Sequence, residues 1–201
     1  MVPAVVLAAG RSSRMGRPKA LLPCGPGQET FVARVVSRVR RGGGGGDVLV
    51  VGRPDDTALR EELDRLALPP RFVENPDPDR GQLSSLIAGL NVADRPGVRG
   101  VLVLPVDIPN VRAATIAAVC EVFAATDAPV VRASSGGRHG HPVIFARRVF
   151  DELRHADPAA GAKAVLRAHA EEIVDVEVND PGVLTDVDAP EDYERLFGVK
   201  P

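Results

Sequence analysis

The sequence predicts a three-layer α/β/α domain built around a mostly parallel sheet. Two observations support this class. Short runs of apolar and β-branched residues alternate with longer segments in which apolar residues recur every three or four positions, which is typical of β–α–β units. The runs at 4–8 and 101–104 are apolar at every position, as expected of central strands that helices cover on both faces.

In the first two thirds of the chain, strands and helices are expected to alternate. The expected strands are the apolar runs at 3–9, 47–52, 71–75, 100–107 and 128–133. The expected helices are the segments of helical period at 30–41, 56–67, 83–93 and 113–125. Because a helix separates each strand from the next, the connections are long enough for crossovers, and the strands are expected to be parallel.

The pattern changes after Ser134. A glycine-rich turn leads into a strand pattern, "SSGGRHGHPVIFA", and the segments 147–156 and 160–172 predict two helices. Residues 173–187 predict one or two strands, and Pro190 marks the first turn of a final helix. No linker separates this part from the rest. We therefore expect it to extend the same sheet, within a single domain that spans residues 1–201.

Composition argues against several classes of function. With 201 residues, 44% apolar and 26% charged, the chain fits one ordinary globular domain. A net charge of −2 gives no overall basic surface, which argues against nucleic-acid binding. Cys24 and Cys120 form neither a metal-binding spacing nor a disulfide framework. Without a long apolar run or a signal-peptide pattern, the protein is expected to be soluble, cytoplasmic and independent of membranes.

The loop after the first strand, "GRSSRMGRPK", is rich in small and basic residues. In an open parallel sheet, ligands bind beyond the carboxyl ends of strands. Ala8, Ala9 and Gly10 would let the backbone approach a base or phosphate, and Arg14 and Lys19 would supply the positive charge that a triphosphate needs. The loop is neither a P-loop nor a GxGxxG fingerprint. The alternative interpretation is a solvated basic loop.

Carboxylates later in the chain are candidate ligands for a divalent cation that offsets the charge of a triphosphate. Asp107 follows an apolar strand, where it either enters the same crevice or turns a surface loop before Pro109. Asp186 and Asp188 stand two residues apart, so in an extended segment their side chains share one face. Asp188 is also well placed to cap the helix that begins at Pro190, which leaves Asp186 as the better metal ligand.

These motifs resemble those of a known family. The stretch "LAAGRSSRMGRPKALLP", Leu7 to Pro23, is similar to LAAGxSxRMGxxKxLLP, the N-terminal signature of the MocA-like nucleotidyltransferases of the molybdenum cofactor group. The strand that ends in an aspartate before a proline and the late "DVDAPEDY" resemble two further family motifs. The resemblance covers nearly the whole chain and is greatest to the molybdenum cofactor cytidylyltransferases. It implies a Rossmann-like nucleotidyltransferase fold with a C-terminal β extension.

The resemblance also implies a nucleotide site and a magnesium site. In the family, the segment "RGQLSSLIAGL" opens a helix whose glycine and serines contact the base and ribose; here the serines could instead cap the helix. Asp107 is expected to bind Mg²⁺, with Asp186, and less firmly Asp188, completing the site. Arg14, Lys19 and Asp107 are the implied catalytic residues, whereas Arg11 and Arg17 are expected only to face water. The implied nucleotide-binding residues are Leu7, Ala8, Ala9, Gly10, Arg14, Lys19, Gly81, Gln82, Ser84 and Ser85.

Two positions in the last third are implied to bind the acceptor substrate. The segment "GHPVIF" is typical of the cytidylyltransferase branch, and its His141 is expected in a rigid, exposed turn that contacts the acceptor. His139 is expected to be structural or solvated. Lys163 stands at an arginine of the family's "GAR" segment, where it touches an acceptor phosphate or caps a helix.

The implied reaction is attack by a terminal phosphate oxygen of the molybdenum-bound pterin cofactor on the α-phosphorus of CTP, with release of pyrophosphate. Asp107 to Pro109 read "DIP" where cytidylylating relatives often carry "DQP", which leaves the second substrate open. The alternatives are GTP or another nucleotide, a different phosphorylated acceptor, or a non-catalytic nucleotide sensor or cofactor chaperone. Small molecules are the expected partners, together with transient contact with a molybdoenzyme.

Overall fold

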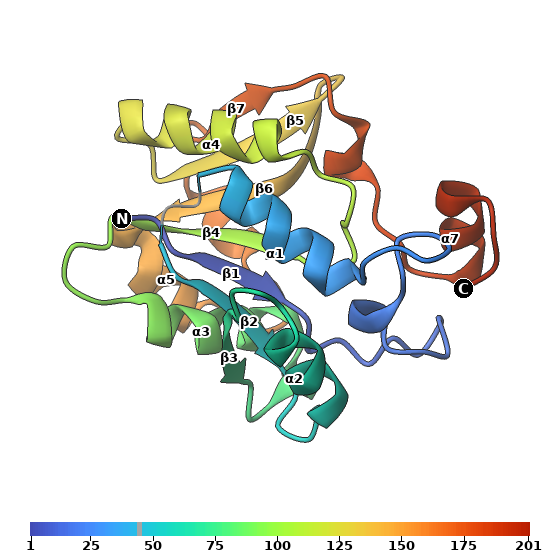
Figure 1. Cartoon of the computed structure of the whole chain (residues 1–201). Coiled ribbons are helices and arrows are strands. Elements are labelled where there is room, and N and C mark those ends of the chain that lie inside the picture. Colours follow the sequence, from blue (N-terminus) through green and yellow to red (C-terminus); the bar gives the residue numbers. More distant parts are fainter. Residues whose placement is uncertain (44–45) are drawn as a thin grey trace.

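The computed structural model of the protein describes residues 1–43 and 46–201. Within them, a seven-stranded sheet has the order β3-β2-β1-β4-β6-β5-β7, with helices on both faces (Figure 1). This arrangement confirms the predicted three-layer α/β/α class. The strands are Ala4–Leu7 (β1), Val48–Gly52 (β2), Arg71–Glu74 (β3), Gly100–Pro105 (β4), Val130–Ser135 (β5), Arg138–Ala146 (β6) and Val174–Glu177 (β7).

The sheet is parallel except at β6, which is antiparallel to both of its neighbours, β4 and β5. A tight turn joins β5 to β6 at Gly136 and Gly137, whose φ angles are 59° and 72°. Positive φ at both central residues suits a two-residue hairpin turn, and glycine adopts it without steric cost. The hairpin reverses the chain, and β7 then adds in parallel beside β5. The C-terminal part therefore extends the same sheet, as predicted.

Two apolar clusters fill the space between the sheet and its helices. Val5 and Val6 in β1 are both fully buried but belong to different clusters, because successive side chains of a strand point to opposite faces. Helices α1, α2 and α4 cover one face, and α3, α5 and α6 cover the other. The helices are Phe31–Arg41 (α1), Thr57–Asp64 (α2), Gln82–Ala93 (α3), Ala113–Ala125 (α4), Phe150–His155 (α5), Lys163–Ala168 (α6) and Pro190–Phe197 (α7).

The last third differs from expectation in detail. The segment 173–187 contains one strand, β7, followed by a 3-10 turn at Pro181–Leu184. Proline cannot donate a ladder hydrogen bond, and the carboxylate of Asp180 accepts a hydrogen bond from the backbone N–H of Gly182 (3.0 Å), which favours the turn. The helices expected at 147–156 and 160–172 are shorter, because residues 147–149 form a separate 3-10 turn and α6 ends at Ala168.

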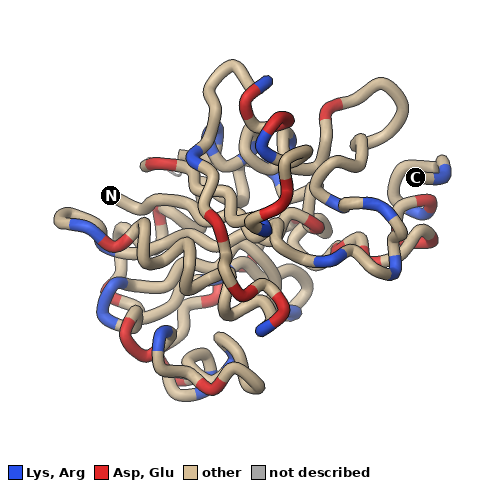
Figure 2. Tube along the Cα trace, turned by 90° about the horizontal axis from the view of Figure 1, so that it is seen from below, with Lys and Arg blue, Asp and Glu red and all other residues tan. Residues whose placement is uncertain are grey.

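Charged residues of both signs are interspersed along the trace in the view of Figure 2. This distribution agrees with the small net charge of −2 and with the expectation of no broad basic face. Among the residues that the structure describes, none of the helices has the length and apolar character needed to cross a membrane.

Candidate active site

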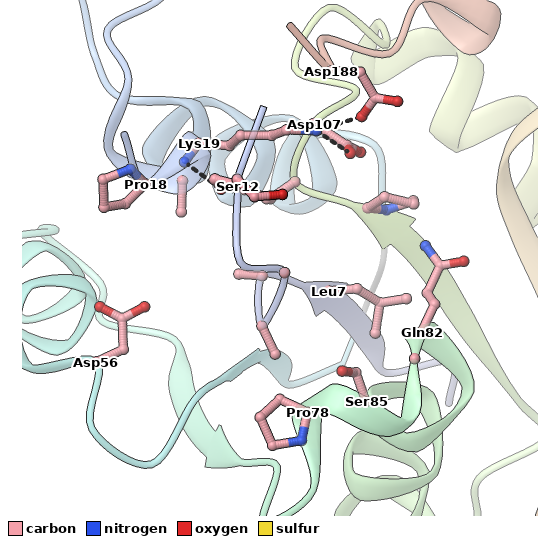
Figure 3. A pocket seen from close by; sticks show the side chains of 18 of the residues that line it. Leu7, Ser12, Pro18, Lys19, Asp56, Pro78, Gln82, Ser85, Asp107 and Asp188 are labelled. Atoms are coloured by element: carbon pink, nitrogen blue, oxygen red, sulfur yellow. Dashed lines mark hydrogen bonds and ion pairs between the residues drawn. The ribbon is translucent and has the colours of Figure 1, made fainter. Parts of the chain in front are cut away.

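A cavity of about 270 Å³ lies at the carboxyl ends of the neighbouring strands β1 and β4, with the start of α3 as its opposite wall (Figure 3). We call it the first cavity. It brings together all the predicted nucleotide-binding residues except Ser84. Its lining consists of Leu7, Ala8, Ala9, Gly10, Ser12, Ser13, Arg14, Pro18, Lys19, Ala20, Asp56, Pro78, Gly81, Gln82, Ser85, Pro105, Val106, Asp107 and Asp188.

Ser12 fixes the backbone of the loop that follows β1. Its φ of 52° lies in the left-handed region, which is uncommon for a residue other than glycine. Its carbonyl accepts hydrogen bonds from the N–H groups of Met15 (3.0 Å) and Gly16 (3.1 Å), and its Oγ accepts one from the N–H of Lys19 (3.0 Å). Met15 is buried in the core. The loop is therefore a folded turn with a fixed backbone at Lys19, although the side chains of Arg14 and Arg17 are exposed.

The ammonium group of Lys19 lies between two carboxylates (Figure 3). Its Nζ is 3.2 Å from Oδ2 of Asp107 and also bonds to Oδ1 of Asp188, and its side chain is only 13% exposed. Arg14 donates from Nη2 to the other oxygen of Asp188 (2.9 Å). The backbone holds the two acids together, because the N–H of Val187 donates to the carbonyl of Asp107 (2.9 Å).

The two carboxyl groups differ in their electrostatic environment. Burial raises the pKa of Asp107, although the nearby Lys19 opposes this shift. The hydrogen bond from Lys19 lowers the pKa of Asp188, and Arg14 adds to the effect. Desolvation disfavours a charged carboxylate, whereas a cationic partner favours it. Asp188 is thus the more acidic of the two carboxyl groups.

The structure corrects the expected capping role of Asp188 and places Asp186 and Asp188 differently. Asp188 does not cap α7; instead Oδ2 of Asp192 accepts hydrogen bonds from the N–H groups of Asp188 (3.0 Å) and Ala189 (2.9 Å). A carboxylate three residues into a helix often reaches back in this way. The side chain of Asp188 is left to line the first cavity, whereas Asp186 is exposed and lies outside that lining. Of the two acids, Asp188 is thus the one that lines the first cavity beside Asp107, while Asp186 still raises the pKa of Asp107 through its charge.

The oxygen donors of the first cavity fit a hard divalent cation. Two carboxylates that reach the same nitrogen atom can equally face one metal ion, and Mg²⁺ and Mn²⁺ prefer oxygen ligands. Across residues 1–43 and 46–201, no group of three or more His, Cys, Asp or Glu side chains is placed to hold a metal. Two carboxylates leave most of an octahedral shell to other oxygens, so the site suits an ion that arrives with phosphates.

At the start of α3, the structure separates the two predicted serines. Gly81 precedes the helix with a φ of 93°, and Gln82 and Ser85 line the first cavity. Ser84 does not: its Oγ donates to the carbonyl of Gly81 (2.8 Å) and accepts from Nδ2 of Asn75 (2.9 Å). Neither serine caps α3, because its N-terminal cap is Gly81. Ser84 thus lies outside the lining of the first cavity, and the capping alternative is wrong for both serines.

Arg11 is engaged in the protein rather than only facing water. Its Nε donates to Oδ1 of Asp79 (2.7 Å), and Nη1 of Arg53 reaches the same oxygen (3.3 Å). The hydrogen bond from Arg11 lowers the pKa of Asp79 strongly. This contact ties the loop after β1 to the segment before α3. Arg17 in the same loop is exposed, as expected.

A second cavity, of about 460 Å³, adjoins the first and shares Leu7 and Gln82 with it. Its floor is apolar, from β4, β6 and α3, and its rim carries four basic or imidazole side chains: Arg132, His139, His141 and Lys163. Sequence reasoning singled out only the last two for this role. The signal for Arg132 was its position as the one charged residue of the strand "VVRASS".

His141 lies within β6, not in an exposed turn. A Cβ at the preceding Gly140 would be 2.1 Å from the carbonyl oxygen of Val183, so the strand packs tightly on the 3-10 turn and His141 becomes partly buried. Burial lowers the pKa of His141 to about 4. A neutral imidazole offers one donor and one acceptor to a ligand. Lys163 is the first residue of α6, which has no side-chain cap, so its expected capping alternative is wrong.

Comparison with known proteins assigns the family. The model of the MobA-like NTP transferase domain matches residues 4–173. The chain belongs to this family. It is 30% identical over 175 residues to the molybdenum cofactor guanylyltransferase of Rhizobium meliloti (strain 1021), a match that covers 83% of this chain and 75% of that protein. It is 28% identical over 206 residues to the purine catabolism protein PucB of Bacillus subtilis (strain 168), covering 96% and 94%.

Solved structures of similar proteins agree with the fold. The crystal structure of Rv0371c from Mycobacterium tuberculosis H37Rv gives a TM-score of 0.82 at 27% identity and covers 99% of both chains. A complex of Rv0371c with manganese gives 0.74 at 27% identity, covering 98% of both. A nucleotidyl transferase from Methanothermobacter thermautotroptrophicus gives 0.80 at 25% identity, covering 98% and 96%. The protein is therefore a nucleotidyltransferase, and the alternative of a non-catalytic sensor is set aside.

Proposed function

We propose that this MobA-like NTP transferase moves a nucleoside monophosphate from a nucleoside triphosphate to the terminal phosphate of the molybdenum-bound pterin cofactor, releasing pyrophosphate. The observation that carries the proposal is the position of Lys19 between Asp107 and Asp188 in the first cavity. Cationic groups that can bind phosphates thus lie in the same cavity as carboxylates that can bind a divalent cation. We further propose that a single domain carries both cavities.

The first cavity is the proposed site of the nucleotide. Small residues from Ala8 to Gly10 leave the backbone open, and a Cβ at Gly10 would meet no atom within 4 Å. Gln82 and Ser85 face them from α3, where they can contact the base or ribose. The side chain of Arg14 is 70% exposed and long enough to follow the phosphates.

The reaction requires mainly that the two substrates are positioned and that the negative charge of their phosphates is neutralised. An oxygen of the acceptor phosphate forms a bond to the α-phosphorus, the bond from that phosphorus to the bridging oxygen breaks, and the electron pair leaves with pyrophosphate. The acceptor phosphate is already largely ionised at neutral pH, so no side chain needs to remove a proton. Lys19 and Arg14 would stabilise the charge that develops. A divalent cation held by Asp107 and Asp188 would supply further neutralisation of the phosphates.

The second cavity is the proposed site of the acceptor. Its apolar floor suits a flat heterocycle, and Arg132, His141 and Lys163 at its rim suit the phosphate. Because the two cavities share Leu7 and Gln82, an acceptor phosphate at this boundary lies next to the nucleotide. This arrangement supports direct transfer between the two substrates, without a covalent enzyme intermediate.

CTP is the first candidate donor and GTP the second. CTP is supported by the resemblance of "GHPVIF" to the cytidylyltransferase branch, and GTP by the guanylyltransferase names of relatives from Rhizobium meliloti and Mycobacterium tuberculosis. The segment "GHPVIF" lies in β6, where Gly140, His141, Val143 and Phe145 line the second cavity. It therefore bears on the acceptor more directly than on the base.

The deciding experiment is a pyrophosphate-release assay with the molybdenum-loaded pterin and each of CTP, GTP, ATP and UTP, with Mg²⁺ or Mn²⁺. We expect release only when the pterin is present, with the highest kcat/KM for CTP; a preference for GTP would select the second candidate. Absence of release with every nucleotide would contradict transfer to the pterin. Release with a different phosphorylated acceptor alone would reassign the second cavity.

Substitutions in the first cavity test the residues. Lys19→Ala should lower kcat by about 100-fold or more, the loss typical of a single group that stabilises transition-state charge. Asp107→Asn should abolish metal-dependent release of pyrophosphate. Arg17→Gln, an exposed cation of the same loop outside the network, is the matched control and should keep the wild-type rate. An unchanged rate for Lys19→Ala would remove the lysine from the mechanism.

A further inference from the structure

The position of Lys19 has a consequence for how the metal binds. Its Nζ is the shared partner of Oδ2 of Asp107 and Oδ1 of Asp188, the two oxygens that converge in the first cavity (Figure 3). A divalent cation bound between these two oxygens would occupy the place where the ammonium group lies. Two cations cannot share that place, because their repulsion is strong at such short range and in a half-buried site.

We propose that Lys19 is an internal stand-in for the divalent cation, which holds Asp107 and Asp188 together in the free protein and yields this place only when a nucleotide arrives. This proposal rests on the proposed function, since it takes the two carboxylates as the metal's ligands. It predicts that the free protein binds divalent cations poorly, and that nucleotide and metal bind together.

The geometry of Lys19 suits such an exchange. Its backbone is held by the hydrogen bond from its N–H to Oγ of Ser12 (3.0 Å) and by its place at the start of the 3-10 helix Lys19–Leu21. Its side chain has four rotatable bonds, so the ammonium group can move while the backbone stays fixed. The cavity in front of it is lined by Gly10, Ser13 and Arg14, where phosphates are proposed to lie. Phosphate oxygens would therefore compete with the carboxylates for the same ammonium group.

The contact of the second oxygen of Asp188, Oδ2, indicates how a nucleotide would bring about this exchange. This oxygen is bonded to Nη2 of Arg14 (2.9 Å), and the side chain of Arg14 is 70% exposed. A triphosphate that drew both Arg14 and Lys19 toward itself would release both oxygens of Asp188 together with one of Asp107. The carboxylates would then become available at the moment when phosphate oxygens are present to complete the shell of the metal.

The alternative is an ordinary ion pair that only stabilises the loop. The two interpretations differ in what happens when the positive charge is removed. An ordinary pair would leave two destabilised acids, with only the small gain in metal binding that the loss of one nearby positive charge gives. A stand-in would leave a vacant position between two carboxylates, which a divalent cation would then fill without any nucleotide.

The experiment is a titration of the whole protein with Mn²⁺ alone, in which the signal of free Mn²⁺ is read by electron paramagnetic resonance. Lys19→Met keeps the length of the side chain and removes its charge, and it should bind Mn²⁺ at least tenfold more tightly than the wild type. Arg17→Met, which changes the net charge equally, should bind as the wild type does. In Lys19→Met with Asp188→Asn, the gain should disappear.

Two results would overturn the proposal. One is Mn²⁺ binding by Lys19→Met that is no tighter than that of Arg17→Met; if circular dichroism shows Lys19→Met to be unfolded, Lys19→Gln takes its place with the same expectation. The other is tight, micromolar binding of Mn²⁺ by the nucleotide-free wild type. Neither measurement uses an acceptor or turnover, so a wrong assignment of base or acceptor would leave both unaffected.

Discussion

Replacing Asp180 by alanine should destabilise the protein and impair the site, although Asp180 lines neither cavity. The Asp180 side chain is only 3% exposed. Its Oδ2 accepts hydrogen bonds from Oγ1 of Thr115 (2.6 Å) and the N–H of Arg112 (2.9 Å), and its Oδ1 accepts one from the N–H of Gly182 (3.0 Å). These contacts tie the start of α4 to the turn that leads toward Asp188, so Asp180 is a positioning residue.

The expected loss of stability follows from the hydrogen-bond donors that Asp180→Ala leaves without an acceptor. A hydrogen bond to a charged group contributes about 1.5–3 kcal/mol, so three of them give about 4–5 kcal/mol at the lower end of that range. Removing the carboxylate also relieves its own desolvation, and water can reach the N–H of Arg112, whose side chain is 60% exposed. We therefore expect a loss of about 3 kcal/mol, which corresponds to a fall in Tm of about 6–12 °C for a domain of this size.

Thermal unfolding followed by circular dichroism measures this change, and urea unfolding gives the free energy independently. Asp55→Ala is the control, because the side chain of Asp55 is 85% exposed and its substitution should cost at most about 0.5 kcal/mol. Below the Tm, Asp180→Ala should also show a reduced kcat, since Asp188 is less firmly placed. A fall in Tm of less than about 2 °C would refute the reasoning that Asp180 organises this segment.

Three further predictions concern the two cavities. Burial lowers the pKa of His141 to about 4, so the stability that the neutral imidazole contributes is fully present above pH 6.5, the ordinary pKa of histidine, and is lost as the pH falls toward 4. Between these pH values the free energy of unfolding should therefore fall more in the wild type than in His141→Gln, by at most about 3 kcal/mol. Parallel pH profiles of the two proteins would contradict this. The Cβ added by Gly10→Ala would meet no atom of the protein within 4 Å, so the Tm should change by less than about 2 °C. Calorimetry should nevertheless show weaker nucleotide binding, because the added methyl group would occupy part of the proposed nucleotide site. Unchanged binding would place the nucleotide elsewhere. Lys163→Ala should raise the KM for the acceptor about tenfold and leave the KM for the nucleotide unchanged, whereas equal changes in both would argue against separate cavities.

The fold could be predicted where local pattern and topology agree. Continuous apolar runs at 4–8 and 101–104 identify central strands, because only burial on both faces tolerates them. The pair Gly136 and Gly137 marks the hairpin by another local signal, because glycine readily adopts the positive φ angles of a two-residue turn. The segment 173–187 was harder, since the turn after β7 is stabilised by contacts of Asp180 with Thr115 and Arg112, which are 65 and 68 residues away in sequence. No local pattern contains that information.

The residues of the site likewise fall into those that local pattern and topology predict and those that only tertiary contacts identify. Lys19 and Asp107 follow two strands that prove to be neighbours, so the rule that loops at the carboxyl ends of parallel strands share an edge brings them together. The choice between Asp186 and Asp188 depends on Asp192, which takes over the capping of α7, and on a lysine 169 residues away. Both residues look alike by spacing. Ser84 and Ser85 pose the same problem: Nδ2 of Asn75 donates to both at 2.9 Å, and only the lining of the folded cavity shows that Ser85 faces it.

The family motifs do not by themselves give the identity of the base. Gln82 lines both cavities, and its side-chain amide carries a donor and an acceptor. Such a group can pair with the edge of cytosine or of guanine, so its presence alone favours neither. The segment "GHPVIF" resembles the cytidylyltransferase branch but faces the second cavity. Discrimination between CTP and GTP is therefore expected to depend on the room that the backbone of Ala8 to Gly10 leaves opposite Gln82 and Ser85, because a purine needs more room than a pyrimidine does.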